Sequence, residues 1–153
     1  IPVGDDNSIA ESFGIKNAEE ACNILLARRI EKIDLGRAGK HYFLNQATIP
    51  GPGATLEIDD YSLEATARGE VRIINLLSDP KAAGPANPHD GKLDIYVKAK
   101  NGLDTHITTS KLTVTHPEFP LLVDGVIEIK TPVEIGVARD SVNVIVGKDR
   151  SFE

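Results

Sequence analysis

The chain has 153 residues, of which 41% are hydrophobic and 26% are charged, a composition typical of one globular domain rather than a disordered segment. Its net charge is −6 and its basic residues are scattered along the sequence, which argues against a nucleic-acid partner. No apolar run approaches the ~20 residues that cross a bilayer, and the single Cys22 excludes an intrachain disulfide and favours a reducing compartment.

The first part of the chain carries two helix patterns. Residues 8–15 predict a short helix that Ser8 caps. A longer helix is expected to begin at Asn17, because Asn17 and Glu20 have the spacing of a capping box and acidic residues occupy the first turn. Cys22 lies within the apolar pattern of this second helix, which predicts that its side chain is buried.

From residue 30 onward the hydrophobic pattern takes the period of strands. Short runs rich in Val, Ile and Thr are separated by Gly, Pro, Asn or Asp, in the order TLEI, EVRIINLL, KLDIYVKA, THITTSKLTVTH, FPLLVD, VIEIK, VEIGVA and SVNVIVG. Regularly spaced strands of this kind predict an antiparallel β-sandwich. The expected fold class is therefore α+β, mainly β, with one or two short N-terminal helices. The longest irregular stretch, residues 78–91, has a length typical of functional or mobile loops.

Three acidic loops are the candidates for chemistry, since no Gly-rich phosphate loop, paired cysteine or HExxH motif is present. They are GDDNS at the start, NPHDGKLD in the middle and VDGV near the end. Each places a carboxylate beside Gly or Asn, where the backbone can turn and expose it to Mg²⁺ or to an attacking hydroxyl. Asp-Gly is also the commonest short hairpin signal, and the residues alone favour plain turns. The four histidines show no metal spacing and are expected to be surface or structural residues.

The order of the segments is more specific than any single motif. IPVGDDNSIAESFGI, NAEEACNILLARR, EKIDLGR and HYFLNQA are followed by DYSLEATARGEVRIINLL, PANPHDGKLDIYV, LLVDGVIEI and a closing VNVIVG. This order resembles the C-terminal part of the diacylglycerol kinase catalytic family, which includes bacterial lipid kinases and sphingosine kinases, over nearly the whole chain. The related nicotinamide-dinucleotide kinases fit the strand motifs less well.

The resemblance implies that residues 1–153 form the C-terminal β-sandwich domain of a two-domain lipid kinase homologue. The N-terminal domain of such an enzyme binds ATP through a Gly-Gly-Asp-Gly loop and is expected to lie outside this chain, which begins at Ile1 and contains no Met. Asn7 matches an Asn that faces the nucleotide cleft in the family. Asp5 stands where Thr is usual and Ser8 where Asp is usual, so this edge of the site is altered.

The middle acidic loop takes a metal-binding role from the resemblance. Asp90 matches the Asp that holds a structural Mg²⁺ in bacterial members. The main-chain carbonyls of Asn87 and Lys92 would complete that site, and a hard cation prefers such a set of oxygens.

The last acidic loop takes the catalytic role. The family usually reads Asp-Gly-Glu, with the Glu as general base on the lipid hydroxyl, but here that position is Val126, which cannot accept a proton. Asp124 is retained and is expected to act through a shared water. Glu128 is a second candidate, although only a bulge or a slipped register would bring it to the place of the lost Glu.

The function implied by the resemblance is transfer of the ATP γ-phosphoryl group to diacylglycerol or a related lipid with Mg²⁺, by a parent protein that is cytoplasmic and peripheral to the membrane. Its partners would be a lipid substrate and a membrane surface, while the isolated chain would be inactive. Two alternatives stay open: a degenerate pseudokinase or lipid-binding module, and a kinase of the same fold with a non-lipid acceptor such as a nicotinamide dinucleotide. Homodimerisation through exposed sheet edges is a further option that no motif supports.

Overall fold

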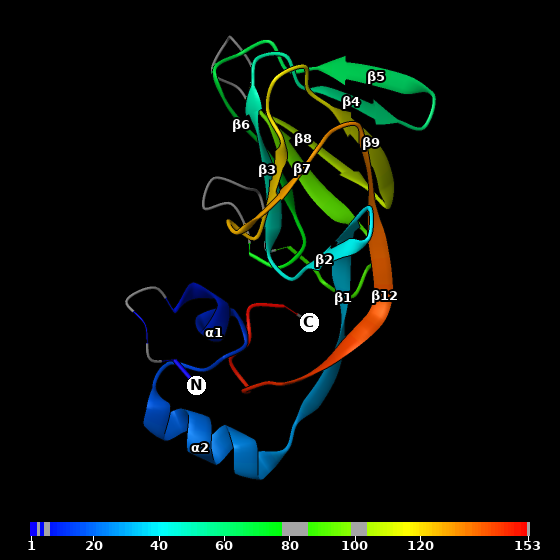
Figure 1. Ribbon diagram of the computed structural model, residues 1–153. Coiled ribbons are helices and arrows are strands. Elements are labelled where there is room, and N and C mark those ends of the chain that lie inside the picture. The colour runs from blue at the N-terminus through cyan, green and yellow to red at the C-terminus, as the bar shows by residue number, and fades with distance from the viewer. Residues whose placement is uncertain (3, 5–6, 78–85, 99–103, 153) are drawn as a thin grey trace.

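The computed structural model describes residues 1–152 except 3, 5–6, 78–85 and 99–103. Two six-stranded antiparallel sheets pack face to face, in the orders β2-β1-β12-β9-β4-β5 and β11-β10-β3-β6-β7-β8 (Figure 1). The expected α+β class, with an antiparallel sandwich and two short N-terminal helices, is confirmed. In chain order the elements are α1 (Ser8–Ser12), α2 (Ala18–Ala27), β1 (Ile30–Ala38), β2 (His41–Phe43), β3 (Gln46–Gly51), β4 (Thr55–Ile58), β5 (Tyr61–Glu64), β6 (Gly69–Ile74), β7 (Leu93–Val97), β8 (Thr105–Thr109), β9 (Lys111–Thr115), β10 (Leu121–Val123), β11 (Ile127–Ile129) and β12 (Val133–Ile145).

The main core lies between the two sheets. Alternate residues of each strand point inward, so that strands such as β4 and β7 place their aliphatic side chains there and their polar ones outside. Leu56, Ile73, Ile95 and Ile135 are fully buried at its centre. Burying a side chain of this size is worth about 1.5–3 kcal/mol, so this layer supplies the main driving force for the sandwich.

A second, smaller core joins the helices to the sandwich. Strands β1 and β12 continue past the sheets to the end of the molecule that carries α1, α2 and both termini (Figure 1). Ile33, Val146 and Phe152 are buried there, and the rings of Phe13 and Phe152 meet edge to face with centroids 5.8 Å apart. The amide of Gly147 donates to the carbonyl of Phe13 at 2.8 Å. The C-terminal segment thus holds α1 in place beside the sandwich.

The helix starts follow the expected chemistry with one correction. The side chain of Asn17 accepts a hydrogen bond from the amide of Glu20 at 2.8 Å, as a capping residue does. In the first helix the N-cap is Asn7 and not Ser8, which is the first helical residue. The side chain of Asn7 makes no capping bond and donates instead to the carbonyl of Gly4 at 2.8 Å.

Helix α2 is less buried than its sequence predicts. Only Ala21 and Ile24 are buried, whereas Leu25 and Leu26 are 47% and 81% exposed. Cys22 is a free, exposed cysteine, so the prediction that it is buried was wrong. The reason is that α2 contacts the rest of the chain along one narrow stripe.

Among the described residues no helix is long and apolar enough to cross a membrane.

Two strand boundaries also differ from the sequence pattern. The run THITTSKLTVTH, expected as one strand, is divided at Ser110 into β8 and β9, which belong to different sheets. Conversely, VEIGVA and SVNVIVG, expected as two strands, form the single long strand β12. Asp140 within it has a φ of +48°, and the pairing with β1 shifts register beside Asp34, so β12 bends instead of ending.

Candidate functional site

Asp124 and Gly125 form the tip of the β10–β11 hairpin. Both have positive φ, +46° and +71°, and the amide of Val126 donates to the carbonyl of Val123 at 3.0 Å. These are the features of a type I′ turn, for which Asp-Gly is a preferred pair because Gly adopts positive φ without strain. Val126 follows the turn with 81% of its surface exposed. An Asp-Gly turn is therefore present, as the residues alone favour.

The carboxylate of Asp124 is held by the neighbouring turn between β2 and β3. Its Oδ2 accepts a hydrogen bond from the amide of Leu44 at 2.9 Å, and its Oδ1 accepts from the amides of Asn45 and Gln46, both at 3.0 Å. A carboxylate offers about four lone-pair positions, so three backbone donors leave roughly one of them free, on Oδ2. Asp124 thus clamps the turn and keeps little capacity to accept a further proton donor.

A hollow of about 470 Å³ reaches the same turn at Asn45. It is lined by the described N-terminal residues, by α1 and by Asn45, and Asn7 is one of its walls. Asn45 thus lines this hollow together with Asn7 and donates its amide to Asp124, and the family resemblance implies that both Asn7 and Asp124 belong to the active site. Asp5, where the family pattern is altered, lies outside the described residues.

Glu128 lies elsewhere. Strands β10 and β11 pair regularly from Leu121↔Ile129 to Val123↔Ile127, with no bulge between them. The shift needed to move Glu128 to the place of Val126 is therefore absent from this described hairpin. Glu128 instead lines a separate hollow of about 400 Å³ with the proline-containing loop after β9. Its catalytic role, like that of Asp124, stays a prediction.

Three oxygens of the loop expected to hold Mg²⁺ accept hydrogen bonds from the protein. The carbonyl of Asn87 accepts a long hydrogen bond from the amide of Asp90 at 3.4 Å, and Oδ1 of Asp90 accepts from the amide of Lys92 at 2.8 Å. A guanidinium nitrogen of Arg139 donates to the carbonyl of Asp90 at 3.1 Å. No group of three or more Asp, Glu, His or Cys side chains suits a metal among the described residues, but the predicted site combines one carboxylate with two main-chain carbonyls. The assignment of Asp90, Asn87 and Lys92 to a Mg²⁺ site stays a prediction.

Sequence reasoning missed Asp34, a buried carboxylate on β1 that is only 3% exposed. Its Oδ1 accepts from the amide of Asp140 at 2.8 Å and its Oδ2 from the amide of Gly91 at 2.9 Å. Its own amide donates to the carbonyl of Pro88 at 2.7 Å. Asp34 therefore fixes both the bend of β12 and the loop that leads to β7. In KIDLG, Asp34 alternates with the apolar Ile33 and Leu35, so the strand pattern places it on the polar face and gave no signal of its burial.

Asn75 extends this polar network to the hairpin turn. Its side-chain amide is 1% exposed and donates to the carbonyls of Asp34 at 3.0 Å and Leu44 at 2.9 Å. Since the amide of Leu44 in turn donates to Asp124, one series of hydrogen bonds runs from the loop at 86–91 to the tip of the β10–β11 hairpin. These hydrogen bonds within the core therefore fix the loop at 86–91 relative to the β10–β11 hairpin tip.

Histidines take structural roles in two places. His116 is buried, and its Nδ1 accepts hydrogen bonds from the amides of Glu118 and Phe119, both at 3.0 Å. Two donors on Nδ1 require the tautomer with the proton on Nε2, which lies 3.2 Å from the carbonyl of Pro52. His106 pairs with Asp94 at 2.7 Å on the outer face of the second sheet. The sequence prediction of surface or structural histidines agrees with this geometry.

Solved structures with the same fold come from Bacillus anthracis str. Sterne and are named diacylglycerol kinases, two of them provisionally. One matches with a TM-score of 0.84 and 17% sequence identity, over 98% of this chain and 69% of its own. A second matches with a TM-score of 0.81 and 19% identity, over 97% and 68%. A third has a TM-score of 0.82 and 18% identity, over 98% and 69%. No family model and no curated protein matches the sequence. The comparison therefore supports the suspected diacylglycerol-kinase-like fold, and identities below 20% show the fold alone.

Proposed function

We propose that this chain is the C-terminal domain of a two-domain lipid kinase, in which it receives the lipid whose hydroxyl takes the γ-phosphoryl group of ATP. The observation that carries the proposal is the fold, which extends over 98% of the chain in a structure named as a diacylglycerol kinase. The matched structures are longer than the matched part, which leaves room in them for a further domain.

The residues of this chain would contribute positioning more than proton transfer. ATP and Mg²⁺ would be bound through the nucleotide-binding domain, and the metal would supply positive charge against the phosphates. Asn7 and Asn45 would form the edge of the cleft that faces the nucleotide. Asp124 would hold that edge rigid and accept the lipid hydroxyl at the one position left on Oδ2.

The loss of a general base makes slow transfer the expected behaviour. A positioned base typically contributes about 10²–10⁴ in rate, and Val126 cannot supply it. The same observation favours a second candidate function, a pseudokinase or lipid-binding module that keeps the fold without the transfer. The heavy use of the Asp124 carboxylate by backbone donors favours this second candidate as well.

The test restores whatever coding sequence precedes residue 1 and measures γ-phosphate transfer from ATP, with Mg²⁺, to diacylglycerol, other lipid alcohols and a nicotinamide dinucleotide. The same assay is repeated with Asp124→Asn and Glu128→Gln, and with Asp60→Asn at an exposed turn as a matched control. Transfer to a lipid that Asp124→Asn abolishes, and that the control keeps, supports the kinase. Lipid binding without any transfer supports the module instead, and transfer only to the dinucleotide would refute a lipid acceptor.

A further inference from the structure

A row of paired residues crosses the outer face of the first sheet. Tyr42 of β2 pairs with Arg37 of β1, Arg37 pairs with Gly136 of β12, and Gly136 pairs with Lys111 of β9. Cross-strand partners point to the same face of a sheet, and Tyr42, Arg37 and Lys111 are all exposed. Gly136 has no side chain between the two cations, so the row is hollowed at its centre.

This hollow is part of a groove of about 590 Å³ with an excess of positive charge. Four cationic side chains and two carboxylates line it, a net charge of +2 on a chain of net charge −6. The charged lining residues are Arg37, Lys92, Lys111, Arg139, Asp90 and Glu134. Cations that are far apart in the sequence therefore meet in the fold.

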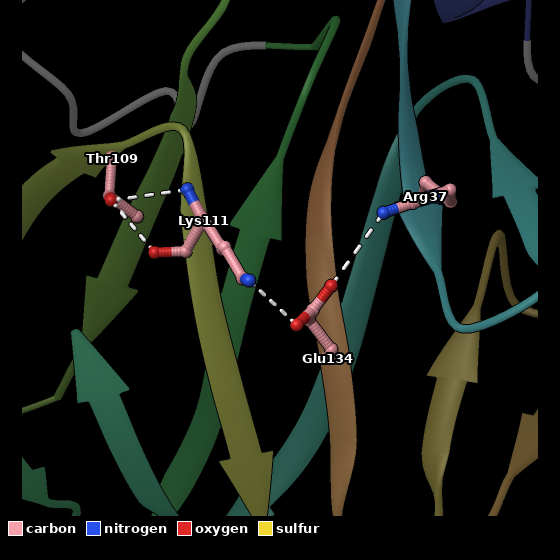
Figure 2. Close-up of polar contacts among 4 residues, drawn as sticks. All are labelled: Arg37, Thr109, Lys111 and Glu134. Atoms are coloured by element: carbon pink, nitrogen blue, oxygen red, sulfur yellow. Dashed lines mark hydrogen bonds and ion pairs between the residues drawn. The ribbon is translucent and has the colours of Figure 1, made fainter. Parts of the chain in front are cut away.

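The cations on either side of Gly136 are held in place by one carboxylate. Glu134 lies between them, 2.8 Å from Nζ of Lys111 and 3.6 Å from a guanidinium nitrogen of Arg37 (Figure 2). The hydroxyl of Thr109 accepts from the amide of Lys111 and donates to its carbonyl, which fixes the backbone of Lys111 (Figure 2). The hydrogen bond and charge of Lys111, followed by the charge of Arg37, keep the pKa of Glu134 below its ordinary value of 4.5, so this carboxylate stays ionised near neutral pH.

The other two cations of the groove have no carboxylate partner within the described part of the chain. Arg139 lies across Gly91, where an added Cβ would fall 2.2 Å from its Nε, and within the part of the chain that the structure describes its guanidinium bonds only to the carbonyl of Asp90. Lys92 takes part in no ion pair among the described residues, and its amide is the group that bonds to Asp90. Their charges are available to a ligand that supplies its own negative charge.

We propose that this groove, named here the Arg37–Lys111 groove, binds phosphate headgroups of anionic phospholipids at the surface of a bilayer. Arg and Lys are the side chains that bind phosphate oxygens, and an unpaired Arg can do so with two parallel hydrogen bonds. Tyr42 is 56% exposed at the end of the row, and a tyrosine with an apolar ring and a polar tip suits the membrane–water interface. An exposed sheet face with an open groove suits a flat surface of headgroups better than it encloses a small free ion.

The groove proposal rests on the proposed lipid kinase function, because the groove would hold the protein against the bilayer that contains its substrate. The binding itself needs neither ATP nor transfer. Sedimentation with vesicles therefore tests membrane binding by the groove independently of the kinase assay. A negative result in either experiment does not decide the other.

The experiment measures partitioning of the protein onto vesicles of phosphatidylcholine with about 30% phosphatidylglycerol, against pure phosphatidylcholine, near 0.1 M salt. Each cation close to an anionic surface contributes about fivefold to partitioning, so the double substitution Lys92→Gln with Arg139→Gln is expected to lower it about 25-fold. Glu134→Gln removes a competing negative charge and is expected to raise partitioning about fivefold. The latter variant keeps the test decisive if the double variant folds poorly.

Lys130→Gln provides the control, because it removes one exposed charge outside the groove. Unchanged partitioning of this control alongside the two opposite effects supports the groove. Equal losses in the control and the double variant would overturn it, as would equal binding to neutral vesicles. Displacement by millimolar inorganic phosphate, or by a short nucleic-acid duplex with the same dependence on Arg139, would assign the groove to a soluble phosphate or to nucleic acid and overturn the membrane proposal.

Discussion

Replacing Asp34 by alanine should destabilise the chain more than any other single carboxylate substitution that we propose. The side chain is 97% buried, since 3% of it is exposed, and both oxygens accept backbone hydrogen bonds. Hydrogen bonds to charged groups contribute about 1.5–3 kcal/mol each, and removing the acceptor takes this partner from the amide of Gly91, which is buried, and from that of Asp140, which is exposed. Because the two bonds share one desolvation cost, we expect a loss of about 3 kcal/mol in the free energy of unfolding rather than their full sum.

Urea unfolding monitored by tyrosine fluorescence measures this loss, with Asp60→Ala as a surface control expected to change stability by no more than about 0.5 kcal/mol. Asp34→Asn is a second variant, since its amide would face one of the two backbone donors. Hydrogen exchange should become faster at the amides of Gly91 and Asp140 before it changes elsewhere. A loss below about 0.5 kcal/mol for Asp34→Ala, or unchanged exchange at both amides, would refute the role assigned to Asp34.

Three further predictions concern other contacts. Asp124→Ala should lower stability by about 2 kcal/mol and speed hydrogen exchange at the three amides that it binds; exchange that stays slow there would contradict the clamp. Carboxyl NMR should place the pKa of Glu134 below its ordinary value of 4.5. Any stability that this carboxylate contributes is therefore present above pH 4.5 and is lost as the pH falls through the lowered pKa. Lys111→Gln should raise that pKa, and an unchanged pKa would reject the ion pair. Gly36→Ala should cost about 1–3 kcal/mol because the new Cβ would fall 2.0 Å from a buried ring atom, whereas Gly136→Ala meets nothing closer than 3.6 Å and should cost far less; equal melting temperatures would contradict this difference.

The sandwich was predictable because each strand buries one face, and apolar and polar residues therefore alternate along its sequence. The turn at Ser110 was not predicted, since residues that favour strands, such as Thr, Ile and Val, occur on both sides of it in β8 and β9. Nor was the bend of β12, which depends on Asp34 reaching Asp140 across 106 positions of sequence. The exposure of Cys22 was not predicted for a related reason. An apolar helix pattern shows which residues can be buried, but the element that packs against the helix determines which of them are buried.

The candidate site shows the same division. The Asp-Gly pair predicted a turn correctly, but only the three amides that reach Asp124 from another hairpin show what its carboxylate does. The scattered lysines and arginines argued against a nucleic-acid partner, and their spacing along the chain does not reveal that Arg37 and Lys111 flank one glycine. Charge clustering in space is set by strand order, which a single sequence does not specify.

The most direct measurement is the rate of γ-phosphoryl transfer from ATP to diacylglycerol by the protein with its preceding segment, compared between Val126, Val126→Glu and Val126→Gln. The side chain at this position is 81% exposed at a hairpin tip, so both substitutions should leave the fold unchanged. A lipid kinase that lacks only its base should gain about 10²–10⁴ in rate with Glu and nothing with Gln. Equal rates for the Glu and Gln variants, or no transfer by any of the three, would contradict the proposal that this domain serves a lipid kinase.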